Sequence, residues 1–432
     1  MTVQLQERIY VHTQRQLANE EAVRRMCASE PILVDVRPAG EVVPGMTPET
    51  ILTSGAPRPW ASYSGGQRSA VIFGAIYEGL AADAADAEAK LSDGRIALGT
   101  CHAHGCVGSV AGIYTASMPV FVVENPPFGN TGFCNLYEGE SRRRLNYGVF
   151  DEEVRDGLKL LEHVIAPTIA AAVRRSGGIP LKPIIKRALH LGDELHSRNT
   201  AATTIFHREL ATPLLDLALD GELSREHAAR TLEFLRASDY FFLRLSMAAS
   251  KATADAAHGI EHSSVMTAMT ISCEDFAIRV SGLGDEWFSG PHPIVEAKLF
   301  EPFTSEDIEW IGGESCITET VGLGGFAQAA AFALQVYQGG SPQEMARINE
   351  QMYRVTVGEH TDYRIPYFGY RGTPVGIDIA KVLETGILPV IDGGLAGRGG
   401  GQIGAGIVKP PHECFADAWA AYLDRYGEGV SP

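Results

Sequence analysis

The chain has 432 residues, too many for one ordinary hydrophobic core, so we expect two or three packed domains. Hydrophobic residues make up 45% of it and charged residues 21%, a balance that excludes an intrinsically disordered chain. The net charge of −17 disfavours nucleic acid and anionic membranes as partners, so an anionic substrate would require a local positive site.

Three features of the sequence predict a cytoplasmic protein. Residues 1–16 are polar and lack the apolar core of a signal peptide. The longest apolar stretch, residues 327–336, is far too short to span a bilayer. The seven cysteines are an odd number without paired CxxC spacing, so we interpret them as reduced thiols.

The first 150 residues carry a mixed pattern of strands and helices. Residues 31–37 form a β-rich run that predicts a buried strand. Residues 70–91 are rich in alanine with helical spacing, and residues 119–123 predict a second strand, closed by a turn that contains two prolines. We therefore expect an α/β domain over residues 1–150.

Helical spacing replaces this pattern at Asp151, a residue that favours the N-cap position. Apolar residues then recur every three or four positions until Gly177 and Gly178 end the helix. Residues 183–257 keep a helical pattern almost without turn signals. A helical domain is expected over residues 151–258.

Apolar runs separated by glycine return in the last part of the chain. Residues 277–280, 372–379 and 387–391 predict strands, and residues 325–337 predict an apolar helix. We expect a second mixed domain over residues 259–432. The predicted fold class is therefore α/β (α+β), with two mixed α/β domains and a helical domain between them.

The loop Cys101-His102-Ala103-His104-Gly105-Cys106 holds four potential metal ligands directly after a predicted strand. Zinc favours thiolate and imidazole ligands, but the ligand pairs of a closed zinc site come from separate elements with wider spacing. A glycine-rich turn with buried cysteines and hydrogen-bonded histidines is the structural alternative. We expect no cofactor, keep Cys101, His102, His104 and Cys106 as weak zinc candidates, and favour a polar loop that faces the substrate.

A dense polar run occupies residues 191–200 within the helical segment. On a helix, Asp193, His196 and Thr200 share one face, and the carboxylate raises the basicity of the histidine, as a general base requires. Arg198 offers a planar fork suited to carboxylate or phosphate. The alternative is an ordinary solvated helix start with a surface ion pair.

Residues 312–325 form a glycine-flanked segment that includes Glu319. Glycines let backbone N–H groups approach a ligand closely, and a helix starting near Phe326 would present its positive end to an anion. Glu319 is a candidate acid, base or amide-recognising carboxylate, and a capping turn at Thr320 is the alternative.

Other motifs are weaker or missing. Residues 399–404 formally match the dinucleotide fingerprint, but Pro410 and Pro411 forbid the helix that this fingerprint requires, so we reject nucleotide binding. Arg68, before a helix, is a further candidate anion ligand, although a lone arginine there is more often structural. Neither a Ser-His-Asp arrangement nor a GxSxG motif can be read from the sequence.

Several short motifs recur in a fixed order along most of the chain. They include Cys101-His102, Val123-Glu124-Asn125, Gly192-Asp193-Glu194 with Arg198-Asn199, Ile317-Thr318-Glu319-Thr320 and Gly376-Ile377-Asp378. In these motifs the chain resembles a bacterial family catalogued as domain of unknown function 1116. One branch of this family is a subunit of oxamate carbamoyltransferase, which acts in anaerobic allantoin breakdown.

The resemblance implies transfer of a carbamoyl group between phosphate and the nitrogen of an oxamate-like amide, within a homo-oligomer or with partner subunits. On this basis we assign anion binding to Arg68 and Arg198. Oxyanion stabilisation or proton transfer falls to His102, His104 and His196, and amide recognition falls to Glu319 and Asp378. The substrate-binding candidates from the matching motifs are Glu124, Asn125, Asp193, Asn199, Thr318 and Thr320.

The sequence departs from the family pattern at Ser54, Cys106, Ser109, Glu314, Cys316 and residues 270–275, which leaves the exact substrate open. It also lacks the Ser-Thr-Arg-Thr phosphate loop of other transcarbamoylases. Two alternatives therefore stand beside carbamoyl transfer. One is a metal-dependent amidohydrolase or lyase acting on a ureido compound, and the other is a non-catalytic subunit that binds a metabolite.

Overall fold

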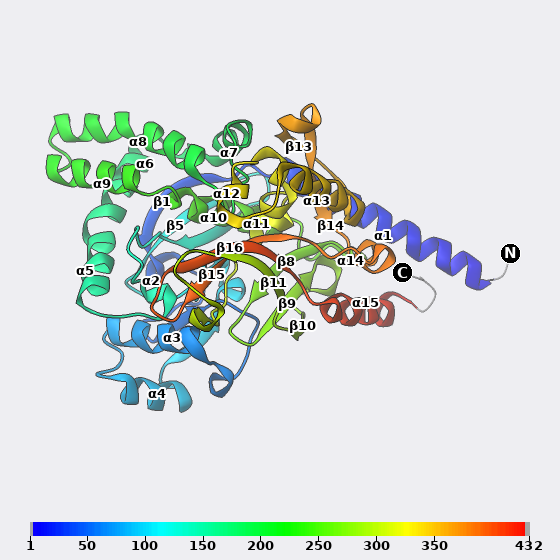
Figure 1. Ribbon diagram of the computed structural model, residues 1–432, viewed down its shortest axis with the longest axis horizontal. Helices are drawn as coiled ribbons and strands as arrows, with labels where there is room; N and C mark the ends of the chain where they lie inside the picture. The colour runs from blue at the N-terminus through cyan, green and yellow to red at the C-terminus, as the bar shows by residue number, and fades with distance from the viewer. Residues whose placement is uncertain (1–2, 428–432) are drawn as a thin grey trace.

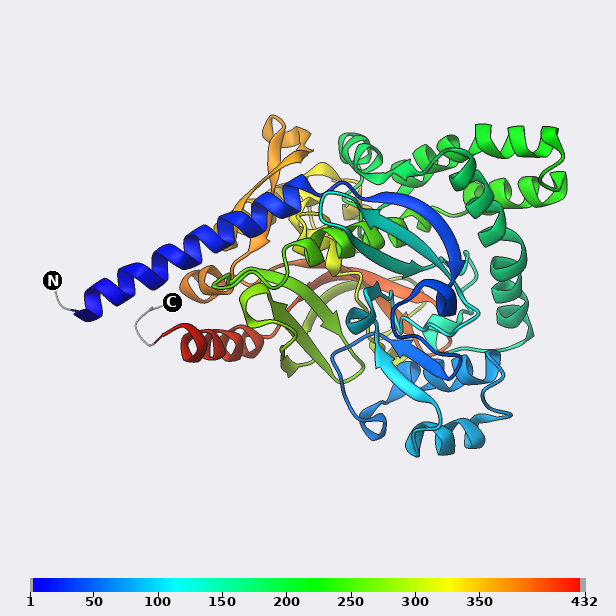
Figure 2. The same ribbon diagram turned by 180° about the vertical axis from the view of Figure 1, so that it is seen from behind.

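The computed structural model describes residues 3–427 and shows a mixed α/β protein, which confirms the predicted fold class. Helix α1 (Val3–Ala28) projects from one end of the molecule (Figure 1). Helices α8 (Thr200–Asp220) and α9 (Arg225–Ala237) form the opposite end, and Figure 2 shows the sheets between these two ends. No helix within residues 3–427 is long and apolar enough to cross a bilayer.

The largest sheet is built mainly from the first 150 residues. Its strand order is β4-β6-β5-β1-β7, and only β4 and β6 run parallel. The bounds are β1 (Ile32–Pro38), β4 (Cys106–Val107), β5 (Pro119–Asn125), β6 (Asn130–Asn135) and β7 (Ile179–Pro180). Strands β1 and β5 confirm two predicted strands. A separate parallel pair joins β2 (Thr50–Thr53) to β3 (Ala97–Thr100).

The helix predicted over residues 70–91 is in fact two helices, α3 (Gly65–Tyr77) and α4 (Ala84–Ser92). The chain breaks between them because Gly79 adopts a φ of 77°, and because Asp83 caps α4 by accepting a hydrogen bond from Asp86 N. The short helix α2 (Ala39–Val42) follows β1.

The predicted N-cap at Asp151 is confirmed, since its carboxylate accepts a hydrogen bond from Val154 N. Helix α5 (Glu152–Leu160) continues through one π-helical turn, Leu161–Ile165, into α6 (Ala166–Arg175). It ends before Gly177 and Gly178, which both have positive φ. Helix α7 (Leu181–His190) follows.

Helix α10 (Phe241–Ala256) is buried along nearly its whole length in the centre of the molecule. It packs against β5 and β6 and against α11 (Ile317–Thr320). Gly132 of β6 permits this close approach, because a Cβ atom there would lie 2.4 Å from Ala248 O. The helix therefore carries Arg244 and Lys251 into the interior, where charged side chains are rare.

The last third of the chain contributes two sheets and a hairpin. Their orders are β10-β9-β8, β11-β16-β15-β12 and β13-β14. The bounds are β8 (Met266–Ile271), β9 (Asp275–Val280), β10 (Trp287–Pro291), β11 (Ile294–Leu299), β12 (Ile308–Glu309), β13 (Thr356–Ile365), β14 (Arg371–Ile377), β15 (Ile391–Gly397) and β16 (Gln402–Lys409). The helices are α13 (Pro342–Val355), α14 (Ile379–Thr385) and α15 (His412–Tyr426).

Two predictions for this third of the chain are wrong. Residues 325–337 form short 3-10 turns and only then α12 (Leu334–Gln338), because Asn349 of α13 takes their backbone groups: it accepts from Ala329 N and donates to Phe326 O. The strand predicted over residues 387–391 begins only at Ile391. Residues 402–409 form β16 rather than a helix, as expected from the two prolines.

One hydrophobic cluster joins the three segments of the chain, since Phe121, Leu210 and Val321 all belong to it. No strand of residues 3–150 pairs with a strand of residues 259–427. The division into domains at residues 150 and 258 stays a prediction. What matters for function is that segments distant in sequence meet around α10.

Candidate active site

A cavity of about 370 Å³ lies where the three segments meet, within the size range of about 300–1,000 Å³ that is typical of small-molecule sites. Its wall includes Arg144 from the segment after β6, Arg244 from α10 and His196 from the loop between α7 and α8. Ser315, two residues before α11, and Asp392 of β15 also line the cavity, as do the carboxylates Glu140 and Glu309.

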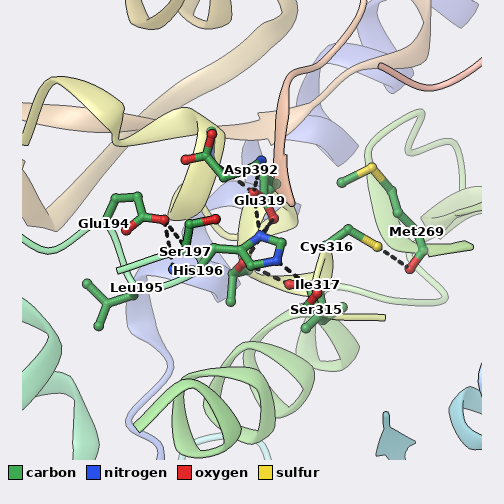
Figure 3. A network of polar contacts seen from close by, with 12 residues as sticks. Glu194, Leu195, His196, Ser197, Met269, Ser315, Cys316, Ile317, Glu319 and Asp392 are labelled. Carbon is green, nitrogen blue, oxygen red and sulfur yellow. Dashed lines mark hydrogen bonds and ion pairs between the residues drawn. The ribbon is translucent and has the colours of Figure 1, made fainter. Parts of the chain in front are cut away.

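His196 lies between a serine and a glutamate at the cavity wall (Figure 3). Its Nδ1 is 2.8 Å from Glu319 Oε1, and its Nε2 is 2.8 Å from Ser315 Oγ. With the carboxylate accepting from Nδ1–H, Nε2 is the acceptor for the serine hydroxyl. The three side chains therefore form one continuous path for a proton, from the cavity to a buried charge.

The Glu319 carboxylate is held by hydrogen bonds on both oxygens. Oε1 accepts from Gly325 N at 3.0 Å and from Asp392 N at 3.1 Å, and Oε2 accepts from the Thr318 hydroxyl at 2.9 Å. Burial disfavours protonation of His196, but the charge and hydrogen bond of Glu319 outweigh it and raise the histidine pKa above its ordinary value. The pair can thus accept a proton readily.

The sequence suggested that glycines of residues 312–325 let the backbone approach a ligand closely. In the structure, Gly324 and Gly325 instead lie against the His196–Glu319 pair. Gly324 has a φ of 56°, and a Cβ atom there would lie 2.1 Å from Glu319 Oε1 and 3.0 Å from His196 Cβ. The N–H of Gly325 donates to Glu319 rather than to a ligand. Glycine is therefore required here because the histidine and glutamate occupy the space beside the backbone.

The prediction that Asp193, His196 and Thr200 share a helix face is wrong, because the chain from Leu191 to Asn199 is a loop. The Asp193 carboxylate accepts from Ala202 N at 2.8 Å, in the first turn of α8, and so stabilises the helix start. Asn199 donates from Nδ2 to His196 O at 2.8 Å. Both candidates therefore shape the loop that presents His196.

Asp392 adds a second buried carboxylate beside the pair. Burial and the nearby charge of Glu319 raise its pKa to about 7. Its Oδ1 accepts from the side-chain amides of Gln328 and Gln338, whereas Oδ2 meets no donor among the described residues. This free oxygen belongs to a residue of the cavity wall, and it can serve as an acceptor for an amide NH₂ group.

Positive charge in the cavity comes from arginines that the sequence analysis did not select. Arg244 is only 3% exposed, its Nη1 donates to Asn135 Oδ1 at 2.8 Å, and its Nε meets no acceptor in the described part of the chain. Arg144 lies between the rings of Tyr137 and Tyr147, at 5.1 Å from each. Arg144 Nε also donates to Ser141 O. Within residues 3–427 neither guanidinium has a carboxylate at ion-pair distance, so the remaining N–H groups of both are available to an anion.

The two arginines chosen from the sequence do not line the cavity. Arg68 donates to Glu88 from Nε at 2.8 Å and stacks over Trp60 at 4.2 Å. Arg198 donates from Nε to Gly192 O at 3.0 Å. Their guanidinium groups are engaged by neighbouring protein groups, which explains their positions without a ligand.

The cysteine–histidine loop also lies outside the cavity, and its four candidate ligands do not converge. Cys101 Sγ contacts Gly112 O at 3.3 Å, and His104 Nδ1 lies 2.7 Å from Pro44 O. His102 is buried against Trp287, with 5.3 Å between ring centroids. Across residues 3–427, no three His, Cys, Asp or Glu side chains are grouped so that they could hold a metal ion.

The remaining substrate-binding candidates have local structural contacts. Asn125 is buried and donates to Ala252 O at 3.2 Å, whereas Glu124 is exposed on β5. Asp378 caps α14 through Ala380 N at 3.0 Å, and Thr320 donates to Ile317 O at 2.6 Å. None of these four side chains lines the cavity.

The comparisons with known proteins agree on one relationship. A model of the family described as oxamate carbamoyltransferase subunit AllG matches residues 96–315. The Escherichia coli (strain K12) protein of that name is 36% identical over 95% of this chain and 98% of its own length. The chain belongs to the AllG family. This confirms the relationship inferred from the order of the sequence motifs.

Two further members of this structural group carry no named activity. The E. coli (strain K12) uncharacterized protein YahG is 40% identical over 95% of this chain and 86% of its own length. A crystal structure of a conserved protein of unknown function from Enterococcus faecalis V583 matches with a TM-score of 0.92 and 39% identity, covering 96% of this chain and 99% of that one. The function is therefore inferred from AllG-family membership and from the groups that line the cavity.

Proposed function

We propose that this chain is a carbamoyl-transferring subunit that moves a carbamoyl group between phosphate and a small anionic amide or ureido acid, such as oxamate or oxalurate. The observation that carries the proposal is that one cavity wall holds His196, whose Nδ1 is paired with the buried Glu319, together with two arginines that have no carboxylate at ion-pair distance. The AllG relative is named as a subunit of an oxamate carbamoyltransferase, so partner subunits belong to the proposal.

Four polar groups of the wall match the requirements of this chemistry. A substrate carboxylate or phosphate needs fixed positive charge, which Arg144 and Arg244 supply despite the overall charge of −17. The carbamoyl NH₂ needs an acceptor, which the free oxygen of Asp392 offers. Proton transfer to and from the reacting nitrogen needs a base of raised pKa, and His196 has one.

The test is a turnover assay on the purified chain, alone and together with the other subunits of an oxamate carbamoyltransferase of the kind that the AllG relative is named for. Oxalurate and phosphate are supplied, and carbamoyl phosphate and oxamate are measured; the reverse direction is followed with carbamoyl phosphate and oxamate. We expect carbamoyl transfer in at least one assembly, and its loss in the Arg244→Met and His196→Asn variants. If no assembly makes or consumes carbamoyl phosphate with any ureido acid, the proposal fails.

A further inference from the structure

We propose that Ser315 is a nucleophile that carries the carbamoyl group as a covalent ester during transfer. The identity of the transferred group rests on the proposed function, whereas the nucleophile itself rests on the geometry of Ser315, His196 and Glu319. Ser315 and Glu319 lie in one segment, 119 and 123 residues after His196 in sequence.

The geometry is that of an activated hydroxyl. Both links of the chain, Oγ to Nε2 and Nδ1 to Oε1, measure 2.8 Å and fall within the range of about 2.6–3.2 Å needed for a nucleophile and its base. The third group, Glu319, fixes the histidine tautomer through Nδ1. A serine, a histidine and an acid in these roles are recognised by geometry, in whatever order the chain supplies them.

The surrounding chain fixes Ser315 in this position. The preceding Glu314 is anchored because its carboxylate accepts from Gly108 N at 2.8 Å and Gly55 N at 3.1 Å. On the other side, Cys316 Sγ contacts Met269 O at 3.1 Å. Ser315 itself is only partly buried and lines the cavity. The backbone thus holds the hydroxyl between two buried anchors and directs it to the cavity.

Neighbouring nucleophiles are less suited to the role. The Cys316 thiol is 1% exposed, and burial raises its pKa well above the ordinary value, so it stays protonated. Burial also raises the pKa of the Tyr240 and Tyr337 hydroxyls at the cavity wall. Among the described residues, Ser197 has no histidine nitrogen within hydrogen-bond distance. Among these groups of the cavity wall, Ser315 is therefore the hydroxyl with an adjacent base.

The reaction proceeds in two balanced steps. Ser315 Oγ attacks the carbamoyl carbon of the ureido acid while its proton passes to His196 Nε2, and the carbon–nitrogen bond breaks as that proton moves to the leaving amide nitrogen. An oxygen of hydrogen phosphate then attacks the carbamoyl-serine carbon while the phosphate proton passes to His196 Nε2, and the bond from that carbon to Ser315 Oγ breaks as His196 returns the proton to Ser315 Oγ. No electrons are gained or lost. In the reverse direction, phosphate is the leaving group and the amide nitrogen attacks the ester.

The first experiment tests the nucleophile without the partner subunits. The full-length chain is mixed with p-nitrophenyl N,N-dimethylcarbamate, which cannot eliminate to an isocyanate and so does not label lysines indirectly. We expect a burst of about one equivalent of nitrophenolate and a dimethylcarbamoyl group on the peptide that contains Ser315. Ser315→Ala should abolish the burst, and Ser315→Cys should restore a labelled site at the same position.

The second measurement separates a catalytic base from a structural contact. Glu319→Gln keeps the size of the side chain but removes the charge that orients His196, and it should slow labelling by about 10²–10⁴-fold. Ser69→Ala, on α3 and outside the cavity, is the matched control and should label at the wild-type rate. Melting temperatures of all variants check that they fold.

The outcomes distinguish this inference from the proposed function. Labelling of Ser315 without carbamoyl transfer in any assembly would support the nucleophile and overturn the proposed function. Carbamoyl transfer that persists within about threefold in folded Ser315→Ala, together with a missing burst in the wild type, would overturn the nucleophile and leave the proposed function standing.

Discussion

Replacement of Arg244 by methionine should change stability and ligand binding in opposite directions. Arg244 is buried, and no carboxylate of the described residues pairs with it. A buried charge without a counter-ion costs several kcal/mol in the empty protein. The variant loses one hydrogen bond to Asn135, which leaves an unsatisfied acceptor at a cost of about 1–3 kcal/mol, but it gains an apolar side chain that fits a buried position.

The net effect on the empty protein should be a stabilisation of about 1–3 kcal/mol. With an unfolding entropy of about 2.1 cal/mol/K per residue, such a gain raises the melting temperature of a chain this long by roughly 1–3 °C. Binding of an anion should weaken by about 2–5 kcal/mol, a factor of about 30 to several thousand, because the partner of a buried charge is removed.

The assay is thermal unfolding of wild type and Arg244→Met, without ligand and across titrations of oxamate, oxalurate and phosphate. The wild type should be less stable when empty and should gain stability with ligand concentration, whereas the variant should start higher and respond little. Arg244→Lys, which keeps the charge but loses the planar fork, should lie between them. A variant that is less stable when empty yet shows the full ligand response would refute the reasoning.

Three further predictions follow from the His196–Glu319 pair and its surroundings. Gly324→Ala should lower dimethylcarbamate labelling at least 100-fold in a folded protein, as judged by circular dichroism, because the new Cβ displaces Glu319. The labelling rate should fall as the pH drops through a value above 6.5, because the reaction requires neutral His196 and Glu319, together with Asp392, raises the pKa of this histidine despite its burial. Glu319→Gln should shift this fall in rate to lower pH. The pKa of Asp392 is about 7 in the folded protein, compared with an ordinary value of 3.8, so the folded state binds this proton more tightly than the unfolded state does. Wild-type stability should therefore fall as the pH rises from about 4 through 7, and melting curves of Asp392→Asn should show a smaller fall over the same range.

Local signals in the sequence were reliable where neighbouring residues decide the structure. The N-cap at Asp151 and the strand around Leu33 depend on contacts within a few positions, and both are confirmed. The loop around His196 was predicted as a helix because its spacing fits a helical face. In the structure the Asp193 carboxylate binds the first turn of α8 instead, and a residue 123 positions away in sequence, Glu319, takes its expected partner role.

Both cavity arginines stand out from their surroundings in the sequence, although neither belongs to a recognised motif. Arg244 interrupts the apolar run Phe241-Phe242-Leu243, and Arg144 ends a run of three arginines in a strongly acidic chain. An arginine is unexpected at each of these positions, which indicates that its charge is kept there for a reason other than folding. Ser315 does not stand out in the sequence, because a serine in a glycine-rich turn is ordinary and His196, its partner, is distant in sequence.

The electrostatic design of the site follows from placing these groups in one cavity. A chain of net charge −17 repels anions at long range, so affinity must come from charges that solvent does not screen. Burial strengthens the attraction of Arg244 for an incoming carboxylate or phosphate. Burial also raises the pKa of Asp392 to about 7, so this carboxyl group keeps its proton at pH values below about 7. Anion entry would add negative charge beside Glu319 and Asp392 and thereby favour protonation of His196. Binding and proton uptake should therefore be coupled, and the affinity for oxalurate should rise as pH falls toward the pKa of His196.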